Sequence, residues 1–322
     1  AVKNIGDAFR LNDVEFEGRM YTPDEVMRIG LARLYQNQTP EGGFAYYSNL
    51  QANPYLTTHV IITLADIRDA GYAIETDRLE RAAAYLSQQL GAQPMPQTSG
   101  RNFLQRIGDR LLPPPPPSGV PVNVLGQQDN DFVILAAYAL SKVPGHEHTS
   151  GIKARITAIA QDADYIREKS SNMSLAYLAM ILTGEYPEKL KESVYHQLEQ
   201  RLVIDGRGAS LSLQGRNPVY QYYETPIKDT AVFLKALAKD QRDIAVLDKI
   251  MRWILASRSK DGAWGSTNNT IAAIDALTDF LNWKKENESE FNLKMTLDTE
   301  QVGERTFDKT NILQSFETFL PM

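Results

Sequence analysis

The chain has 322 residues and no cysteine, and its 43% hydrophobic and 23% charged residues are typical of a folded globular protein. The lack of cysteine excludes disulfides, thiolate metal sites, a cysteine nucleophile and, within these residues, a cysteine–glutamine thioester. A net charge of -6 argues against nucleic acid or an anionic membrane as the main partner. No apolar run approaches the roughly 18 residues that a membrane span needs.

The sequence begins at Ala1 without a basic segment followed by an apolar one, so it shows no targeting signal. We expect it to be a piece of a longer polypeptide.

A polar helix with one apolar stripe, followed by a more uniformly apolar helix, recurs five times along the chain. The first polar helix is predicted from Thr22 to about Asn37, because Thr-Pro-Asp-Glu at its start has the pattern of a capping box with proline in the first turn. Its apolar partner is predicted over Thr57–Ala70. The other pairs are predicted at Asp77–Leu90 with Asp131–Lys142, Ile152–Lys169 with Ser171–Thr183, Glu188–Leu202 with Thr225–Lys239, and Arg242–Ser257 with Thr267–Leu281.

This alternation predicts the architecture. A helix that is apolar all round must be covered on every side, whereas a striped helix needs cover on one side only. Two concentric rings meet both needs, with the apolar helices inside and the striped ones outside. A superhelical solenoid of helix pairs is the alternative, but it would leave one face of each pair more polar than these helices are. We therefore predict an all-α toroid with five helix pairs.

Two loops between polar and apolar helices share an acidic–glycine–small–aromatic order. They are Glu41-Gly42-Gly43-Phe44 and Asp261-Gly262-Ala263-Trp264, and Gly206-Arg207-Gly208-Ala209 is a degenerate third copy. Glycine lets the chain turn sharply, and the aromatic ring can fill the gap between neighbouring pairs. We interpret these aromatic residues as packing elements rather than as a ligand site.

Residues 91–128 do not fit the repeat. They contain the run Pro113–Pro117, which forces polyproline II geometry and predicts an exposed, stiff excursion. We interpret it as a structural strut, and partner docking through the proline run is the alternative.

After Glu290 the period of the pattern changes to two. Phe291, Leu293, Met295 and Leu297 alternate with polar residues, which predicts a half-buried strand. A turn is predicted at Gln301–Glu304, a returning strand from Arg305 to Asp308 and a third strand over Ile312–Leu320. Three short strands are too few for a stable domain. The predicted domains are thus a toroid, residues 1–288 with its insertion at 91–128, and a partial β segment, residues 289–322.

The four histidines give little evidence of chemistry. His59 falls in a predicted inner helix and is interpreted as a packed histidine, and His196 falls on an outer helix facing solvent. His146 and His148 have a spacing that could bind a metal in an extended loop, but a surface loop is the simpler interpretation.

The toroid fold also occurs in enzymes, so carboxylates on the inner helices need attention. Asp66, Asp229 and Asp275 could act across a central funnel on a carbohydrate or isoprenoid, although spacing alone does not show that they converge. Asp129-Asn130-Asp131 is the nearest approach to an acidic protonation motif, and it is better explained as a helix N-cap.

Several segments resemble the thioester domains of the alpha-2-macroglobulin and complement family, bacterial alpha-2-macroglobulins in particular. The resemblance rests on the order of Leu31–Gln38, Gly42–Tyr47 and Pro54–Val60, followed much later by Gly262–Thr267 and the alanines of the last inner helix. It covers roughly residues 22–310. The segment after Glu290 is similar to the return into the family's CUB-type β domain.

The resemblance implies an α6/α6 toroid of the terpenoid cyclase-like type, with a sixth inner helix before Thr22. The family carries its Cys-x-Glu-Gln thioester motif there, and residues 1–21 contain no such motif. Either the motif lies outside the chain, or the chain belongs to a branch without a thioester.

The function implied is that of one domain of a protease-trapping inhibitor rather than an enzyme. No catalytic residue, metal ligand or cofactor is expected in this chain. The implied partners are target proteases, caught by the full-length protein, and neighbouring macroglobulin-type β domains. The implied location is the periplasm or cell envelope, with a lipid anchor in a region upstream.

Overall fold

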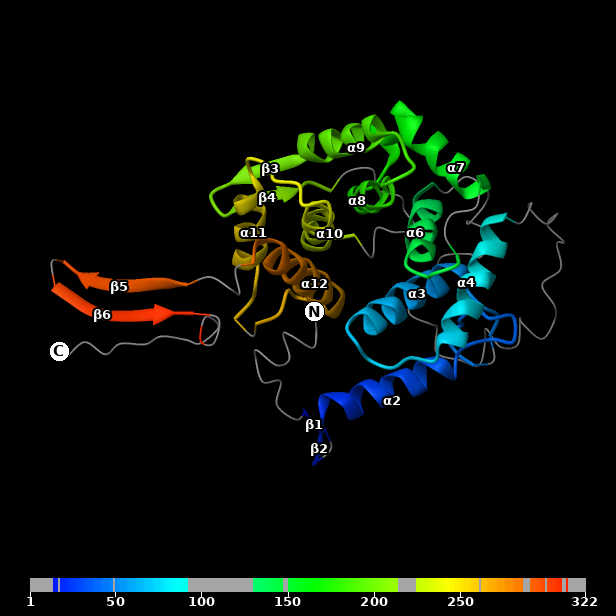
Figure 1. The fold of residues 1–322 in the computed structure, drawn as a ribbon, viewed down its shortest axis with the longest axis horizontal. Coiled ribbons are helices and arrows are strands. Elements are labelled where there is room, and N and C mark those ends of the chain that lie inside the picture. The colour runs from blue at the N-terminus through cyan, green and yellow to red at the C-terminus, as the bar shows by residue number, and fades with distance from the viewer. Residues whose placement is uncertain are drawn as a thin grey trace, which may run out of the picture.

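The computed structural model describes residues 14–16, 18–48, 50–91, 130–146, 150–213, 224–260, 262–285, 290–298, 300–308 and 311. The helices form two rings (Figure 1). The outer ring holds α2 (Pro23–Tyr35), α4 (Thr76–Gly91), α7 (Ser150–Gln161), α9 (Glu188–Gln200) and α11 (Leu247–Ala256). The inner ring holds α3 (Pro54–Asp69), α6 (Asn130–Ser141), α8 (Asn172–Ile181), α10 (Pro226–Lys239) and α12 (Thr267–Lys284). The predicted α/α toroid with five helix pairs is confirmed.

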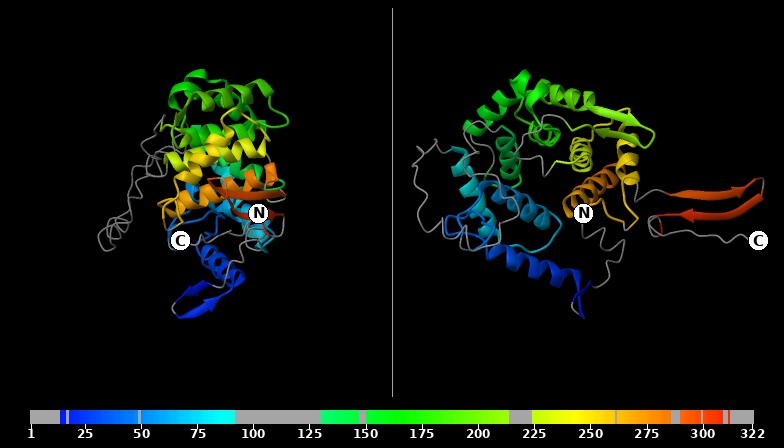
Figure 2. Two further views of the ribbon diagram at one scale, coloured as in Figure 1. Left: turned by 90° about the vertical axis from the view of Figure 1, so that its left-hand side faces the viewer. Right: turned by 180° about the vertical axis from the view of Figure 1, so that it is seen from behind.

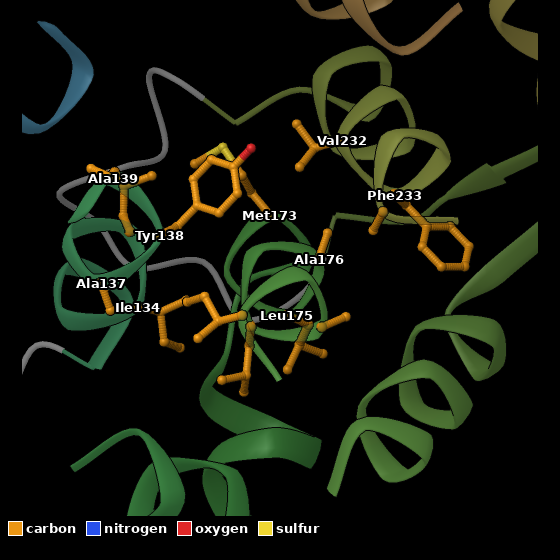
Figure 3. Close-up of a cluster of buried hydrophobic side chains, with 14 of the residues drawn as sticks. Ile134, Ala137, Tyr138, Ala139, Met173, Leu175, Ala176, Val232 and Phe233 are labelled. Carbon is orange, nitrogen blue, oxygen red and sulfur yellow. The ribbon is translucent and has the colours of Figure 1, made fainter. Parts of the chain in front are cut away.

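The core lies where the inner helices meet. Every residue of α6 from Asp131 to Leu140 is buried, and α10 is buried without interruption from Asp229 to Ala238. Figure 3 shows side chains of three adjacent inner helices meeting, with Ile134 and Tyr138 on α6, Leu175 and Ala176 on α8, and Val232 and Phe233 on α10. Alanine at many of these positions lets the helices approach closely, while the large side chains fill the space between them.

The inner ring is open at one point. Inner helices pack in the order α3, α6, α8, α10 and α12, and in the described part of the chain no comparable packing joins α12 back to α3. On α12 the side chains of Ile271 and Ile274 are 61% and 46% exposed, although the neighbouring Ala273 and Ala276 are fully buried. Helices at the two ends of an open ring lack a neighbour on one side, which explains these exposed isoleucines.

The helix predicted over Ile152–Lys169 is wrong in its second half. The α-helix α7 ends at Gln161, and a separate π-helical turn, η1, covers Tyr165–Lys169. The break occurs because the Asp162 side chain accepts a hydrogen bond from the backbone N–H of Tyr165 at 3.0 Å, which starts a new turn. Elsewhere the predicted helices differ from the observed ones mainly at their ends, and α11 begins five residues later than predicted.

Three antiparallel two-stranded hairpins accompany the helices. They are β1 (Val14–Phe16) with β2 (Arg19–Tyr21), β3 (Leu202–Asp205) with β4 (Gly208–Leu211), and β5 (Phe291–Leu297) with β6 (Glu300–Phe307). The first two were not predicted as strands. The hairpin β5–β6 extends away from the helices, as Figure 1 and the right-hand view of Figure 2 show.

The turn predicted at Gln301–Glu304 is wrong, because these residues belong to β6. The chain reverses instead next to Asp298, which has a left-handed φ of 53°. Aspartate adopts this conformation more readily than most residues, so it can close a tight turn. The third strand predicted over Ile312–Leu320 and almost all of the proline-rich segment 91–128 lie outside the described residues.

Candidate functional site

The loops that lead from outer to inner helices share one hydrogen-bonding pattern. In the loop after α2, the N–H of Thr39 donates to the Gly43 carbonyl and the N–H of Gly42 donates to the Thr39 carbonyl. In the loop after α11, the N–H of Ser259 donates to the Ala263 carbonyl and that of Gly262 to the Ser259 carbonyl. The two loops are therefore structural equivalents, as their sequences suggested.

A second contact ties each loop to its inner helix. The N–H of Phe44 donates to the hydroxyl of Thr57 on α3 at 2.8 Å, and the N–H of Trp264 donates to that of Thr270 on α12 at 3.1 Å. The strand β4 makes the same contact, since the N–H of Leu211 donates to Thr230 on α10 at 3.0 Å. We call this contact the loop–threonine clasp. Among the described residues it occurs in three of the five pairs, and it supports the Gly206–Ala209 region as the third copy.

Two of these loops need glycine at their turns. Gly42 has a φ of 96°, and a Cβ atom there would lie 2.5 Å from the carbonyl oxygen of Arg81 on α4. Gly208 has a φ of 147°, and a Cβ atom would lie 2.2 Å from the carbonyl oxygen of Lys249 on α11. Each glycine therefore lets the loop pack directly on the backbone of a neighbouring outer helix. Phe44 and Trp264 are 0% and 5% exposed, which supports packing as their role.

A buried polar network lies where the inner helices begin, and Arg201 is its centre. Arg201 caps the end of α9, and its side chain donates to the carbonyls of Ser170 and Ile166 at 3.0 and 2.9 Å. It also donates to the Asn172 side chain at 3.1 Å. Arg201 is 3% exposed, and burial lowers the pKa of its guanidinium. One residue thus joins the end of an outer helix to η1 and to the start of α8.

Asp229 continues this network into α10. Its Oδ2 accepts a hydrogen bond from the amide of Asn172 at 3.1 Å, while its buried Oδ1 has no hydrogen-bond partner among the described residues. The residue is 1% exposed, and burial raises the pKa of its carboxyl to about 7, against smaller opposing effects of Asn172, Lys228 and Arg201. From the N-cap of α10, the Thr225 hydroxyl donates to Asn269 on α12 at 2.7 Å. The first turns of α8, α10 and α12 are therefore linked in series.

A charged cluster lies farther along the same inner helices. Lys235 on α10 forms ion pairs with Asp275 and Asp279 on α12, and Lys142 pairs with Asp66 on α3 at 2.8 Å. Burial alone would lower the pKa of Lys235, but the surrounding acidic groups raise it instead. Lys235 is therefore held as a cation. In addition, Lys239 on α10 donates to the Tyr138 hydroxyl on α6 at 3.0 Å. The cluster connects α3, α6, α10 and α12 through paired charges.

The three carboxylates considered as an enzymatic set do not form an acid–base pair of the glycosidase kind. Asp66 and Asp275 are each neutralised by a lysine, and Asp229 is buried in the separate network at the helix starts. A hydrolytic pair needs one carboxyl to be protonated and another to be ionised across an accessible cleft. The ion pairs of Asp66 and Asp275 join α3 to the end of α6 and α12 to α10.

His59 lies on inner helix α3, as predicted. Its ring contacts Tyr55 edge to face at a centroid distance of 4.6 Å. Burial, with a smaller effect of Lys228, lowers the pKa of His59 to about 3, so the imidazole is neutral near pH 7. His196 is exposed on α9 next to Gln200, as predicted, whereas His148 lies outside the described residues.

The helix α6 begins at Asn130, within the segment interpreted as an N-cap, and Asp129 lies outside the described residues. Asp131 lies inside the first turn of α6 and accepts a hydrogen bond from the hydroxyl of Tyr165 in η1. The described residues contain no group of three or more His, Cys, Asp or Glu side chains positioned to hold a metal ion. In the same part of the chain, none of the helices has the length and apolar character needed to cross a bilayer.

The two rings, the repeated clasps and the buried polar network define a domain of the α/α toroid class. The family model of the A-macroglobulin TED domain matches residues 118–280, half of the chain. The chain therefore belongs to the A-macroglobulin TED domain family. No curated protein matches it by sequence.

Solved alpha-2-macroglobulins are similar in fold. The native protein from Escherichia coli, spanning domain MG7 to the C-terminus, is 17% identical over 88% of this chain and 39% of its own, with a TM-score of 0.50. Trypsin-activated alpha-2-macroglobulin from Escherichia coli is 16% identical over 92% of this chain and 18% of its own, with a TM-score of 0.53. Salmonella alpha-2-macroglobulin reacted with methylamine is 16% identical over 89% of this chain and 16% of its own, with a TM-score of 0.55. The chain thus spans less than half the length of each of them.

Proposed function

We propose that this chain is the thioester-type domain of a bacterial alpha-2-macroglobulin-like protein that traps proteases. The observation that carries the proposal is the fold match to alpha-2-macroglobulins over 88–92% of the chain, together with the family match. In this role no residue of the chain is catalytic and no cofactor is needed. The protein acts by changing shape around a protease that has cut it elsewhere.

The domain divisions follow from this role. Residues 1–288 form the toroid, and residues 289–322 contribute strands to a neighbouring CUB-like β domain. The hairpin β5–β6 supports this division, because Phe291, Leu293 and Leu297 are 47%, 37% and 54% exposed on one strand. A two-stranded hairpin with such a face is marginally stable alone and needs further strands or another layer to cover it. Macroglobulin-type β domains of the same polypeptide are the proposed partners.

The toroid suits a domain that moves as a unit. The network around Arg201 and the charged cluster around Lys235 connect outer helix to inner helix and inner helix to inner helix. Buried polar groups that bond to one another between helices favour one arrangement of the helices over others. A rearrangement that starts at a cleaved segment elsewhere would therefore displace the whole toroid rather than distort it.

Two readings of protease capture are compatible with this proposal, one with a covalent thioester bond and one without. These 322 residues contain no cysteine, so a thioester cannot form within them. A thioester supplied by a preceding segment would tether the protease covalently, while a branch without one would rely on enclosure alone. We expect the protein to reside in the periplasm or cell envelope, held by a lipid anchor in a region upstream.

The test uses the full-length protein that carries this domain, incubated with trypsin. Captured trypsin is expected to keep its activity on a small chromogenic peptide and to lose its activity on a large protein substrate, because only the latter is kept away by the enclosing protein. Trapping would be ruled out if, at every ratio of the full-length protein to trypsin, the same fraction of trypsin activity remained on both substrates. Pretreatment with methylamine separates the two readings, since it abolishes covalent capture only where a thioester exists.

An enzymatic function on carbohydrate or isoprenoid predicts turnover by the 322-residue chain itself. The ion-paired state of Asp66 and Asp275 argues against it. The corresponding measurement is hydrolysis or cyclisation of those substrate classes by the purified chain, for which we expect no rate above that of buffer.

A further inference from the structure

A groove separates α2 from the segment that joins α3 to α4. Its volume is about 830 Å³, within the range of sites that bind ligands. One wall is a single face of α2, and the other is the extended segment 71–75. The lining apolar residues are Met27, Leu31 and Tyr35 on α2 and Tyr72 and Ile74 opposite.

The wall at 71–75 has the features of an unpaired strand edge. Exposure alternates along it, with Tyr72 and Ile74 half-buried and Gly71, Ala73 and Glu75 exposed. The N–H of Glu75 donates to the hydroxyl of Tyr35 on α2 at 3.0 Å, so this edge of the segment faces α2. In an extended chain, residues two apart direct their amide groups to the same edge. Ala73 lines the groove, and neither its N–H nor its C=O bonds to a described residue.

The face of α2 carries two charges above its apolar residues. Asp24 and Arg28 both line the groove, and neither forms an ion pair with a described residue. They stand four residues apart, so their positions are separated by about 6 Å along the helix axis. Residues two apart in an extended peptide are separated by about 6.6 Å. A basic and an acidic side chain at such positions would match Asp24 and Arg28.

We propose that this groove binds an extended peptide segment by strand addition. The backbone of the peptide pairs with Ala73, two apolar side chains enter against Met27 and Leu31, and a flanking basic–acidic pair meets Asp24 and Arg28. Main-chain hydrogen bonds supply affinity in this mode, and the pockets for alternate side chains supply selectivity. The site is independent of the buried network and of the charged cluster, so it does not rest on the proposed trapping function.

The experiment measures binding of capped octapeptides to the 322-residue chain by fluorescence anisotropy. The peptides carry lysine and glutamate two residues apart, and the two inward positions vary over all apolar residues. At least one peptide is expected to bind with a dissociation constant below about 1 mM. N-methylation of the peptide nitrogen that bonds to Ala73 should weaken it about tenfold, because the side chains are kept and one hydrogen bond is lost.

Protein variants test the same contacts. Ala73→Pro removes an N–H that has no described partner and should also weaken binding about tenfold. Met27→Glu places a charge on the groove floor and should abolish binding, whereas Ile29→Glu, on the outward side of α2, should leave it unchanged. The proposal is overturned if no peptide of the set binds, or if binding is indifferent to both N-methylation and Ala73→Pro.

Discussion

Arg201 shows how one side chain can hold several elements together. At 3% exposure its guanidinium is out of reach of bulk water, and its donors bond to the carbonyls of Ser170, Ile166 and Arg167. Unsatisfied buried acceptors cost about 1–3 kcal/mol each. The residue therefore matters through the groups it satisfies more than through its charge.

We predict that Arg201→Met lowers the free energy of unfolding by about 3 kcal/mol or more, because it removes the donor to two buried acceptors, the Ser170 carbonyl and the Asn172 side-chain oxygen. Urea denaturation followed by circular dichroism measures this. The control is Arg207→Met, where the side chain is 64% exposed, pairs with Asp205 and lies 6.0 Å from the centre of the Trp253 ring. A loss at Arg207 as large as that at Arg201 would contradict the argument.

Asp229 gives the chain a pH-dependent stability. Its pKa is raised from 3.8 to about 7 by burial, so between these values the folded chain holds a proton that the unfolded chain has released. The contribution to stability is complete below about pH 4 and is lost as the pH rises to about 7, a loss of at most about 4 kcal/mol. Lys228, Arg201 and Asn172 are the groups that oppose this shift.

Asp229→Asn should remove this dependence, because asparagine stays neutral and can still accept from Asn172. Between about pH 5 and about pH 8, the free energy of unfolding of the native chain falls. We expect the fall to be smaller in the variant by roughly 2–4 kcal/mol. Urea denaturation at both pH values measures it. The matched control is Asp248→Asn on the exposed surface of α11, and an unchanged pH dependence in Asp229→Asn would be evidence against the burial effect.

At the scale of elements, the loop–threonine clasp explains why three helix pairs share one geometry. In each of them a threonine in the first turns of the inner helix accepts the N–H of a buried loop residue. The contact fixes where the loop ends and the helix begins, and it satisfies a donor that water cannot reach. Breaking the contact therefore costs the free energy of leaving one buried N–H without an acceptor.

We predict that Thr57→Val destabilises the chain by about 1–3 kcal/mol, because valine keeps the shape of threonine but cannot accept the N–H of Phe44. Thr63→Val on the same helix is the control, since Thr63 is exposed and its hydroxyl bonds only to the His59 carbonyl. For both variants, the shift of the midpoint of urea denaturation measures the change in stability, provided that the dependence of the free energy of unfolding on urea concentration stays the same. Equal shifts would show that the clasp adds nothing beyond the helix propensity of the residue.

The helix pairs could be predicted from sequence because apolar periodicity is a local property. It identified all five inner helices and distinguished them from the striped outer ones. It failed at Asp162, where one side-chain hydrogen bond ends α7 and starts η1 without changing the apolar pattern. It failed again at Gln301–Glu304, because Gly303 looks like a turn residue but pairs with Met295 in the hairpin β5–β6.

The polar network could not be predicted, because its members are far apart in the chain. Arg201, Asn172 and Asp229 come from three helices, and each is a common residue type with no spacing signal. The grouping of Asp66, Asp229 and Asp275 was suggested by their inner helices, but the structure pairs two of them with lysines and buries the third elsewhere. Only the glycine–aromatic loops gave a signal in sequence that the clasps then explained.

At the scale of the whole molecule, the ring of inner helices closes everywhere except between α12 and α3. The exposed Ile271 and Ile274 mark this opening, and the hairpin β5–β6 follows directly after α12. Exposed large apolar side chains also occur elsewhere in the described residues, for example Val26 and Ile29 on α2 and Val203 and Ile204 on β3.

The hairpin β5–β6 should be separable from the toroid. Its two strands pack chiefly against one another, through pairs such as the stacked rings of Phe291 and Phe307 at 5.1 Å. We predict that deleting residues 290–322 leaves the thermal midpoint of the toroid within about 2 °C, because no helix loses extensive packing. The same deletion should reduce self-association, since it removes two free strand edges and an exposed apolar face. Calorimetry measures the midpoint and size-exclusion chromatography the association, and a fall of about 10 °C would place the hairpin within the toroid's folding unit instead of a neighbouring domain.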